Sequence, residues 1–346
     1  MYKVGDRILG KYEILELMKP GSFGAVFRVH NYAIDRQSVV KIVRADDPTY
    51  LKELIESYAQ HSCKHDKIVE IHACEIIEFQ PPGTAAMPAV AMELEWIPGG
   101  TWGGAIEKSY VPISASCGYA SDVLFGLQFA HTNEVIHGDV KPDNVFLTAQ
   151  GAKLADFGLS KLAKLPGRNR AQALFYRTHG APEQHLSSDI DRRTDVFATG
   201  MTLFRSVNNI TDWQGRVAAV RDSESAMKKG ILKEKIGYAD EVPRKIRGII
   251  NRACNPNPDL RYASCAEFRQ ALDQLRFNAH WVRNGSSFTS LTRGREEQIT
   301  ILTRRLDYEV EYKLNGRRVN AKCASFANLK EAEAYQARYL YDNTVE

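Results

Sequence analysis

The sequence predicts an α+β protein with two lobes, a small one rich in β-strands followed by a larger helical one, and a short α+β segment at the end. Three observations predict this order. Hydrophobic alternation of period two dominates from Tyr12 to Val43. Helical spacing dominates from about residue 101 to residue 277. Strand-like alternation returns after residue 278 and is followed by one more helical stretch.

The first lobe begins as a meander of short antiparallel strands. The segments YEILEL, AVFRV and SVVKIV alternate in strand fashion and are separated by Pro-Gly-Ser at 20–22 and by HNYAIDR. At about 49–63 the apolar residues recur at spacings of three and four, which predicts a helix. Two further strand candidates, KIVEIHACEII and AVAMELEW, flank the loop QPPGTAAMP.

A hinge is expected at Trp96 to Gly100, where Pro-Gly-Gly follows the last of these strands. Beyond it, SASCGYASDVLFGLQFAHTN predicts a long helix. In the final segment ITILTRR, YEVEYKL and RRVNAKCASF predict strands, and Asn315-Gly316 predicts a hairpin turn between the second and third. The stretch ANLKEAEAYQARYLY then predicts a helix capped by Asn328.

Composition excludes several classes of protein. The 346 residues are 44% hydrophobic and 25% charged, and the formal net charge of +4 is too small to predict specific nucleic acid binding. The six cysteines are spread along the chain in no disulfide or zinc pattern. The charged N-terminus resembles no signal peptide, and no apolar run approaches the length of a membrane span. We therefore expect a cytoplasmic protein without membrane contact.

The first lobe carries residues suited to holding phosphates. In PGSFGAVF, Gly21 and Gly24 allow a hairpin to lie close over phosphate oxygens, where backbone N–H groups can donate. Lys41 follows in the middle of the apolar strand VVKIV. A lysine buried there requires a partner, and Glu56 on the next predicted helix is a plausible one.

The stretch HGDVKPDN, residues 137–144, has the three kinds of group that phosphoryl transfer needs. Asp139 can orient a hydroxyl and accept its proton, Lys141 can neutralise developing charge, and Asn144 can bind a metal ion. Twelve residues later, Asp156 in LADFGL offers a second metal ligand.

From Tyr12 to Phe277 these motifs resemble a eukaryotic-type serine/threonine protein kinase. GSFGAV is similar to the end of the Gly-rich loop, VVKI to the third-strand lysine motif, HGDVKPDN to the catalytic loop, and DFG and APE are intact. DVFATG resembles the start of the buried helix whose aspartate, here Asp195, holds the catalytic loop. PNPDLRYAS places Arg261 where the family pairs an arginine with the APE glutamate, here Glu183.

The resemblance implies a bilobal kinase fold. Its N-lobe covers residues 1–97 and its C-lobe residues 98–277, and a small α+β domain of unknown role follows at 278–346. It further implies that the protein binds ATP and Mg²⁺ and transfers the γ-phosphate to Ser or Thr hydroxyls of proteins. Lys141, two residues after the catalytic aspartate, is typical of Ser/Thr rather than Tyr kinases.

The roles of individual residues follow from the same resemblance. Lys41 would hold the α- and β-phosphates and pair with Glu56 in preference to Glu53, and Leu94 would be the gatekeeper. Asp139 and Lys141 complete the catalytic set. The other residues expected to contact ATP or its metal are Gly21, Ser22, Phe23, Gly24, Val26, Glu95, Ile97, Asn144 and Asp156, of which Asn144 and Asp156 bind Mg²⁺.

Two positions depart from the family pattern. Lys19 replaces the first glycine of the Gly-rich loop, and Gly138 replaces the arginine of the usual HRD sequence, which makes this a non-RD sequence. Control through an activation-loop phosphate is therefore not expected. Two alternatives remain open: a small-molecule phosphotransferase of the aminoglycoside or choline kind, and an ATP-binding pseudokinase scaffold.

Between DFG and APE the chain carries basic residues and no acidic one; they are Lys161, Lys164, Arg168, Arg170 and Arg177. We interpret this stretch as a solvated basic loop, with attraction of acidic substrate segments as the alternative hypothesis. Ser160, Tyr176 and Thr178 are possible autophosphorylation sites, and Thr178 is a candidate for contact with the catalytic aspartate. The final domain is expected either to pack against the helical lobe or to recruit a substrate or partner.

Overall fold

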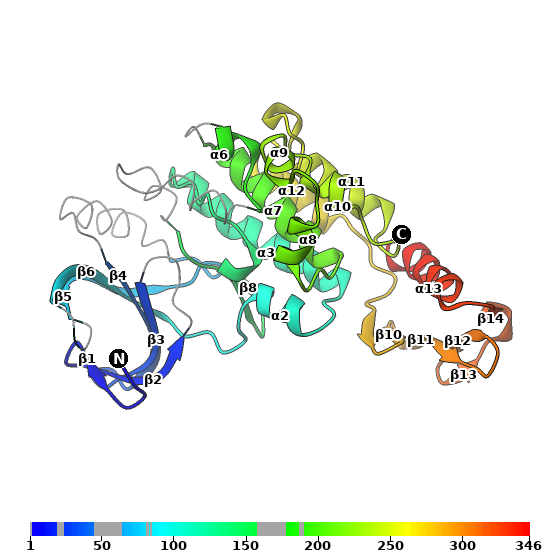
Figure 1. Cartoon of the computed structure of the whole chain (residues 1–346), viewed down its shortest axis with the longest axis horizontal. Coiled ribbons are helices and arrows are strands. Elements are labelled where there is room, and N and C mark those ends of the chain that lie inside the picture. The colour runs from blue at the N-terminus through cyan, green and yellow to red at the C-terminus, as the bar shows by residue number, and fades with distance from the viewer. Residues whose placement is uncertain are drawn as a thin grey trace.

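The computed structural model describes residues 2–18, 24–44, 64–80, 83, 85–157, 178–186 and 190–346. Over these ranges the chain forms a β-rich lobe, a helical lobe and a tail domain, which follow one another along the length of the molecule (Figure 1). The bilobal α+β architecture predicted from the sequence is confirmed. The helix expected at 49–63 lies outside the described residues.

The N-lobe is a six-stranded antiparallel sheet with strand order β1-β2-β3-β4-β6-β5. The three segments of the predicted meander pair with their neighbours as β2, β3 and β4. Alternate residues of these strands, such as Ile14, Val29 and Val40, have no exposed surface and belong to the core of this lobe, whose sheet is curled (Figure 1). The strands are β1 (Arg7–Ile8), β2 (Tyr12–Met18), β3 (Gly24–Asn31), β4 (Arg36–Arg44), β5 (Ile71–Phe79) and β6 (Met87–Glu95).

A buried carboxylate joins four of these strands. Glu93 of β6 is 5% exposed and accepts hydrogen bonds from Tyr12 Oη at 2.9 Å, Asn31 Nδ2 at 2.9 Å and Ser38 Oγ at 2.7 Å. Burial alone would raise the pKa of Glu93, but these three donors lower it below its usual value. The carboxylate therefore stays charged and fixes the end of β6, three residues before the hinge expected to begin at Trp96.

The C-lobe is built around α7, an almost wholly buried helix. Every residue of α7 from Thr194 to Val207 is buried, and the long helix predicted after the hinge, α3, packs against it. Asp191 begins α7 with a capping box. The helices are α2 (Trp102–Lys108), α3 (Ile113–Thr132), α6 (Pro182–Leu186), α7 (Arg192–Val207), α8 (Trp213–Ala218), α9 (Ser223–Lys228), α10 (Leu232–Ile236), α11 (Arg244–Ala253) and α12 (Cys265–Asp273).

Three short elements complete the lobe. The 3₁₀ turn η1 (Pro142–Asn144) leads into the hairpin of β7 (Val145–Thr148) and β8 (Gly151–Leu154), which sits at the boundary with the N-lobe. A second 3₁₀ turn, η2 (Pro258–Leu260), precedes α12. Among the described residues no helix is long and apolar enough to cross a membrane.

The tail domain is a sheet with helix α13 (Leu329–Thr344) on one face. Asn315 and Gly316 both have positive φ, +49° and +74°, and join β12 to β13 as a two-residue turn, as predicted. Asn328 caps α13 by accepting a hydrogen bond from the amide of Glu331, also as predicted. The strands are β9 (Val282–Asn284), β10 (Ser287–Thr292), β11 (Arg295–Thr303), β12 (Tyr308–Leu314), β13 (Arg317–Arg318) and β14 (Ala324–Phe326).

Two expectations for the tail need correction. The predicted strand RRVNAKCASF is interrupted by the 3₁₀ turn η3 (Asn320–Lys322), which separates β13 from β14. Both β13 and β14 pair with β12. The strands β9 and β10 were not predicted. Their sequence is rich in Ser and Thr and holds few large apolar residues, so its alternation is weak.

The tail is docked on the C-lobe through its own two ends. Phe277 forms a β-bridge with Val345, and the amide of Asn278 donates to the carbonyl of Thr344 at 3.0 Å. Beside this junction the ring of Tyr110 packs edge-on against Phe288, with centroids 5.3 Å apart. α13 lies next to α11 at the end of the C-lobe remote from the N-lobe (Figure 1).

Candidate active site

The loop at residues 137–144 is held by a buried carboxylate of α7. Asp195, with no exposed surface, accepts hydrogen bonds from the amide of His137 at 2.9 Å and from the amide of Gly138 at 2.7 Å. Its Oδ2 also lies 2.8 Å from Nε2 of His131. Because three polar groups surround the carboxylate, its burial is compensated and the loop backbone is fixed. The role that the resemblance gave to Asp195 is confirmed.

Gly138 occupies a position where the backbone itself makes the contacts. Its φ of +71° lies in the left-handed region, which glycine enters without steric cost. Its carbonyl accepts a hydrogen bond of 2.7 Å from Nε2 of Gln184, and Oε1 of Gln184 accepts one from the amide of Ala181. Gln184 therefore ties this loop to the APE segment, a connection that the sequence analysis missed.

Two side chains of this loop, those of Lys141 and Asn144, contact the carboxylate of a third residue, Asp139. Lys141 Nζ lies 2.8 Å from Asp139 Oδ2, and Asn144 Nδ2 donates to the same oxygen at 3.1 Å and to the carbonyl of Asp139 at 2.8 Å. The side chains of Asp139 and Lys141 are 29% and 26% exposed, so solvent or a substrate hydroxyl can reach them. These contacts bring together the three side chains singled out in HGDVKPDN, and their roles stay a prediction.

Asp156 comes to the same place from the other side of the β7–β8 hairpin. The amide of Ala155 donates to the carbonyl of Asn144 at 2.8 Å, and Nε2 of His137 donates to the carbonyl of Ala155 at 2.8 Å. Asp156 itself has a φ of +65°, an uncommon conformation for a residue with a side chain. The two neighbouring backbone contacts hold the chain in this conformation.

Lys41 of β4 reaches Asp156 across the boundary between the lobes. Its Nζ lies 2.7 Å from Asp156 Oδ1. Burial on its own would raise the pKa of Asp156, but the ammonium of Lys41, followed by His137 and Lys141, lowers it below the usual value. The predicted pairing of Lys41 with Glu56 stays a prediction, because Glu56 lies outside the described residues.

The donor set fits a hard divalent cation. Because Nδ2 of Asn144 is turned toward Asp139, the Oδ1 of Asn144 has no hydrogen-bond partner among the described residues, and Oδ2 of Asp156 takes no part in the ion pair with Lys41. Amide and carboxylate oxygens are ligands that Mg²⁺ accepts. Within the described ranges no group of three or more His, Cys, Asp or Glu side chains forms a metal site, so a cation here would complete its shell with phosphate oxygens and water.

A small apolar cluster lies between the hinge and this site. Val69, Ile97 and Ala155 are buried together, with Leu94 and Phe146 packed against them. Within the described residues neither the amide nor the carbonyl of Ile97 has a hydrogen-bond partner. Apolar side chains next to backbone groups that have no partner among the described residues are the surroundings that a flat heteroaromatic ring requires.

Strand register places the other predicted nucleotide-binding residues. Val26 of β3 lies opposite Lys41, and Leu94 of β6 lies opposite Val39. The side chain of Glu95 is held by Lys153 at 2.8 Å, and its amide donates to the carbonyl of Glu70 at 3.0 Å, so neither group is left for the predicted contact with adenine. Gly21, Ser22 and Phe23 lie outside the described residues, as do Lys19 and the basic segment 158–177; Gly24 is the first residue of β3.

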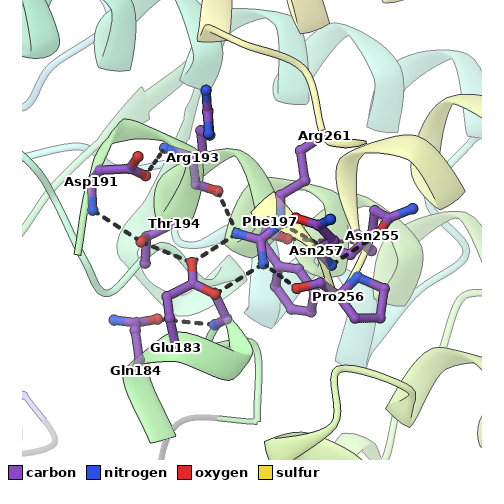
Figure 2. A network of polar contacts seen from close by, with 12 residues as sticks. Glu183, Gln184, Asp191, Arg193, Thr194, Phe197, Asn255, Pro256, Asn257 and Arg261 are labelled. Atoms are coloured by element: carbon purple, nitrogen blue, oxygen red, sulfur yellow. Dashed lines mark hydrogen bonds and ion pairs between the residues drawn. The ribbon is translucent and has the colours of Figure 1, made fainter. Parts of the chain in front are cut away.

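The APE segment is anchored by a buried arginine, as the resemblance implied. Figure 2 shows the guanidinium of Arg261 facing the carboxylate of Glu183, with contacts of 2.7 and 2.9 Å. Thr194 Oγ1 donates to the same carboxylate at 3.0 Å. Despite burial, which would raise the pKa of Glu183, Arg261 and Thr194 lower it.

Thr178 does not have the role that the sequence suggested. It is 5% exposed, and its hydroxyl accepts a 2.7 Å hydrogen bond from Nε1 of Trp213. His179 stacks on the same indole, with centroids 4.8 Å apart, and burial next to Arg205 and Lys141 holds its pKa well below the usual value. The predicted contact between Thr178 and Asp139 was wrong, because among the described residues the Thr178 hydroxyl lies within hydrogen-bond distance of Trp213 and His179 and of no carboxylate. An enclosed hydroxyl is also inaccessible to phosphorylation.

The comparison with known families identifies the chain. The protein kinase domain family matches residues 12–274, and the chain belongs to this family. The identification made from the sequence motifs is thus confirmed.

Individual relatives give the same result. Serine/threonine-protein kinase Pkn1 of Myxococcus xanthus is 27% identical over 296 residues, which cover 80% of this chain and 40% of Pkn1. Serine/threonine-protein kinase PknA of Mycobacterium tuberculosis is 25% identical over 284 residues, 79% of this chain and 63% of PknA. The chain thus spans only part of the length of these relatives. The crystal structure of the Mycobacterium tuberculosis PknI kinase domain shares the fold, with a TM-score of 0.55, 20% identity, and coverage of 79% of this chain and 99% of that one.

Proposed function

We propose that this chain is an ATP- and Mg²⁺-dependent serine/threonine protein kinase. The observation that carries the proposal is the convergence of Asp139, Lys141 and Asn144 of one loop with Asp156 and Lys41. Phosphoryl transfer asks little covalent chemistry of the protein. It needs an oriented hydroxyl, cations on the phosphate oxygens and a held metal, and this cluster supplies groups for each.

Each residue has a role in this proposal. Asp139 orients the acceptor hydroxyl and takes its proton, and Lys141 exchanges its contact with Asp139 for the transferring phosphoryl oxygens. Asn144 and Asp156 hold Mg²⁺, which neutralises charge on the phosphates. Lys41 binds the α- and β-phosphates, paired with Glu56. The backbone of Glu95 to Ile97 hydrogen-bonds adenine, whose ring lies on the apolar cluster of Val69, Leu94 and Phe146.

A protein is the favoured acceptor over a small molecule. The Glu183–Arg261 anchor fixes the APE segment, and Gln184 connects that segment to the backbone of the catalytic loop. Both contacts support a preformed platform for an extended peptide beside Asp139. The basic segment between DFG and APE favours substrates with acidic stretches, and the tail domain is proposed to recruit substrates or partners. The glycine at position 138 favours control by a route other than an activation-loop phosphate.

Transfer of labelled γ-phosphate from Mg-ATP tests the proposal. The purified chain and its Asp139→Asn variant are each given protein substrates and, separately, small amino-alcohols. Label on protein Ser or Thr with the wild type and none with the variant is the expected result. Label confined to small molecules would establish the aminoglycoside- or choline-like alternative. Nucleotide binding without transfer would establish a scaffold.

A further inference from the structure

A buried arginine of α7 lies directly beneath the catalytic loop. Arg205 is 3% exposed, and its Nη2 lies 3.3 Å from Glu107 Oε1 while its Nη1 lies 3.9 Å from Asp143 Oδ2. Its Nε donates to the carbonyl of Ile210 at 3.4 Å. A buried guanidinium requires opposite charge nearby, and these two carboxylates provide it.

The two carboxylates, unlike the arginine, face solvent. The side chains of Glu107 and Asp143 are 57% and 55% exposed. Asp143 lies in η1 between Pro142 and Asn144, and the side chain of Asn144 touches Asp139. Asp143 is therefore one residue from a side chain that touches the proposed base, so a peptide bound at Asp139 can share its surface.

Close packing keeps Asp143 against α2. A Cβ atom added to Gly103 of α2 would lie 2.6 Å from Asp143 Oδ1. Glu107 follows one helical turn later on α2 and so lies above the same arginine. The result is a pair of surface acids with a single buried positive charge behind them.

We propose that Arg205 sets the charge preference for the substrate by neutralising Asp143 and Glu107. This inference rests on the proposed kinase function. With Arg205 in place the three groups carry a net charge of −1, and without it they carry −2 on the surface beside the base. Opposite charge at this surface strengthens the encounter with basic peptides. Arg205 thus weakens the attraction for basic residues that flank the acceptor hydroxyl. Peptides with neutral or acidic residues at these positions are then preferred.

The experiment compares two Ser peptides of equal length, one with basic and one with acidic residues around the acceptor. The measured quantity is the ratio of their kcat/KM values, basic over acidic, for the full chain. Arg205→Met is expected to raise this ratio about tenfold and Asp143→Asn to lower it, since close charges couple at this order of magnitude. The double variant is expected to return toward the wild-type ratio. Arg193→Met, which removes an exposed positive charge from the same helix, should leave the ratio unchanged.

Salt separates an electrostatic role from a structural one. The tenfold change is expected to shrink as ionic strength rises from about 0.05 M to about 1 M, because the screening length falls to about 3 Å. If Arg205→Met does not fold, Arg205→Gln decides the matter. Glutamine can still donate a hydrogen bond to a carboxylate but carries no charge, so the net charge becomes −2 and a rise of the same size is expected.

The outcomes separate this inference from the function on which it rests. Transfer to both peptides with the same ratio in wild type and in the folded Arg205 variants overturns the inference and leaves the kinase function intact. A ratio that changes equally at low and high salt also overturns it. If the wild type shows no phosphate transfer, or only transfer that persists in Asp139→Asn, both the inference and the proposed kinase function are overturned.

Discussion

The C-lobe contains two acid–base pairs that differ in exposure. Asp139 and Lys141 meet through one contact of 2.8 Å, and both side chains remain more than a quarter exposed. Glu183 and Arg261 meet through contacts of 2.7 and 2.9 Å, and the arginine side chain has no exposed surface (Figure 2). The first pair lies in the proposed active site, and the second is packed inside the C-lobe.

The comparison shows how a carboxylate paired with a cation can exchange its partner when the cation is an exposed lysine and stays fixed when it is a buried arginine. A lysine ammonium is a single point charge on a flexible stem, so Lys141 can change partner at little cost. The planar guanidinium of Arg261 fits one carboxylate in one orientation and also bonds to the carbonyls of Arg193 and Asn255. Exposure and the number of fixed contacts distinguish the working pair from the structural pair.

The largest expected effect comes from the exposed pair. Asp139→Asn should lower kcat by about 10³-fold, because the amide cannot accept the hydroxyl proton. The free energy of unfolding should change by less than about 1 kcal/mol, as for other exposed ion pairs. Single-turnover transfer and urea unfolding measure the two quantities. A large loss of stability would show that the two pairs do not differ as described.

The buried pair should show the reverse pattern. Glu183→Gln leaves the charge of Arg261 buried and without its counter-ion, and should lower the free energy of unfolding by about 3 kcal/mol. The matched control is Asp259→Asn, which breaks the exposed ion pair of Arg193 and should cost less than about 1 kcal/mol. Urea unfolding of the two variants side by side makes the measurement. Equal losses would contradict the comparison.

The same pair predicts how stability depends on pH. The folded-state pKa of Glu183 lies below its usual value of 4.5. Its stabilising contribution is therefore fully present above pH 4.5 and is lost as pH falls through the lower, folded-state value. The difference in unfolding free energy between wild type and Glu183→Gln should be constant near neutral pH and narrow progressively as the pH falls below 4.5. A difference that widens in acid would have the wrong sign.

The smallest effect should come from a third charged contact, between the C-lobe and the tail. The guanidinium of Arg247 lies 5.6 Å from the ring centroid of Tyr341 on α13 and 5.4 Å from that of Tyr238. Tyr341→Leu keeps apolar bulk and removes the ring, and should cost about 0.5 kcal/mol. Thermal unfolding with Tyr335→Leu as the comparison inside the tail measures it. A loss above about 2 kcal/mol would show that the docking of the tail resembles the buried pair.

Local sequence patterns were sufficient for most of the fold and for the central residues of the site. The meander, the long helix α3 and the turn at Asn315-Gly316 all follow from periodicity or from residues with special backbone preferences. Asp139, Lys141 and Asn144 are close in sequence, so their spacing alone brings them together.

The contacts that could not be predicted join residues far apart in the chain. Gln184 and Gly138 are 46 positions apart, and Trp213 and Thr178 are 35 apart. Neither pair has a local signal, because a glutamine or a tryptophan in a helix is compatible with many partners. Arg205 was missed for a related reason: a charged residue in an apolar helix indicates burial with a partner but does not identify that partner.

The junction between the tail and the C-lobe also determines how the molecule would carry a mechanical load. Residues 276–278 and 344–346 run side by side, joined by the bridge of Phe277 with Val345 and by backbone hydrogen bonds at 3.0 Å. A pull applied at Glu346 enters the C-lobe through this short zipper, and the sheet of the tail lies outside the path of the force. Tension would therefore open the zipper before any strand of the tail is stretched, and it would release the tail as one folded unit.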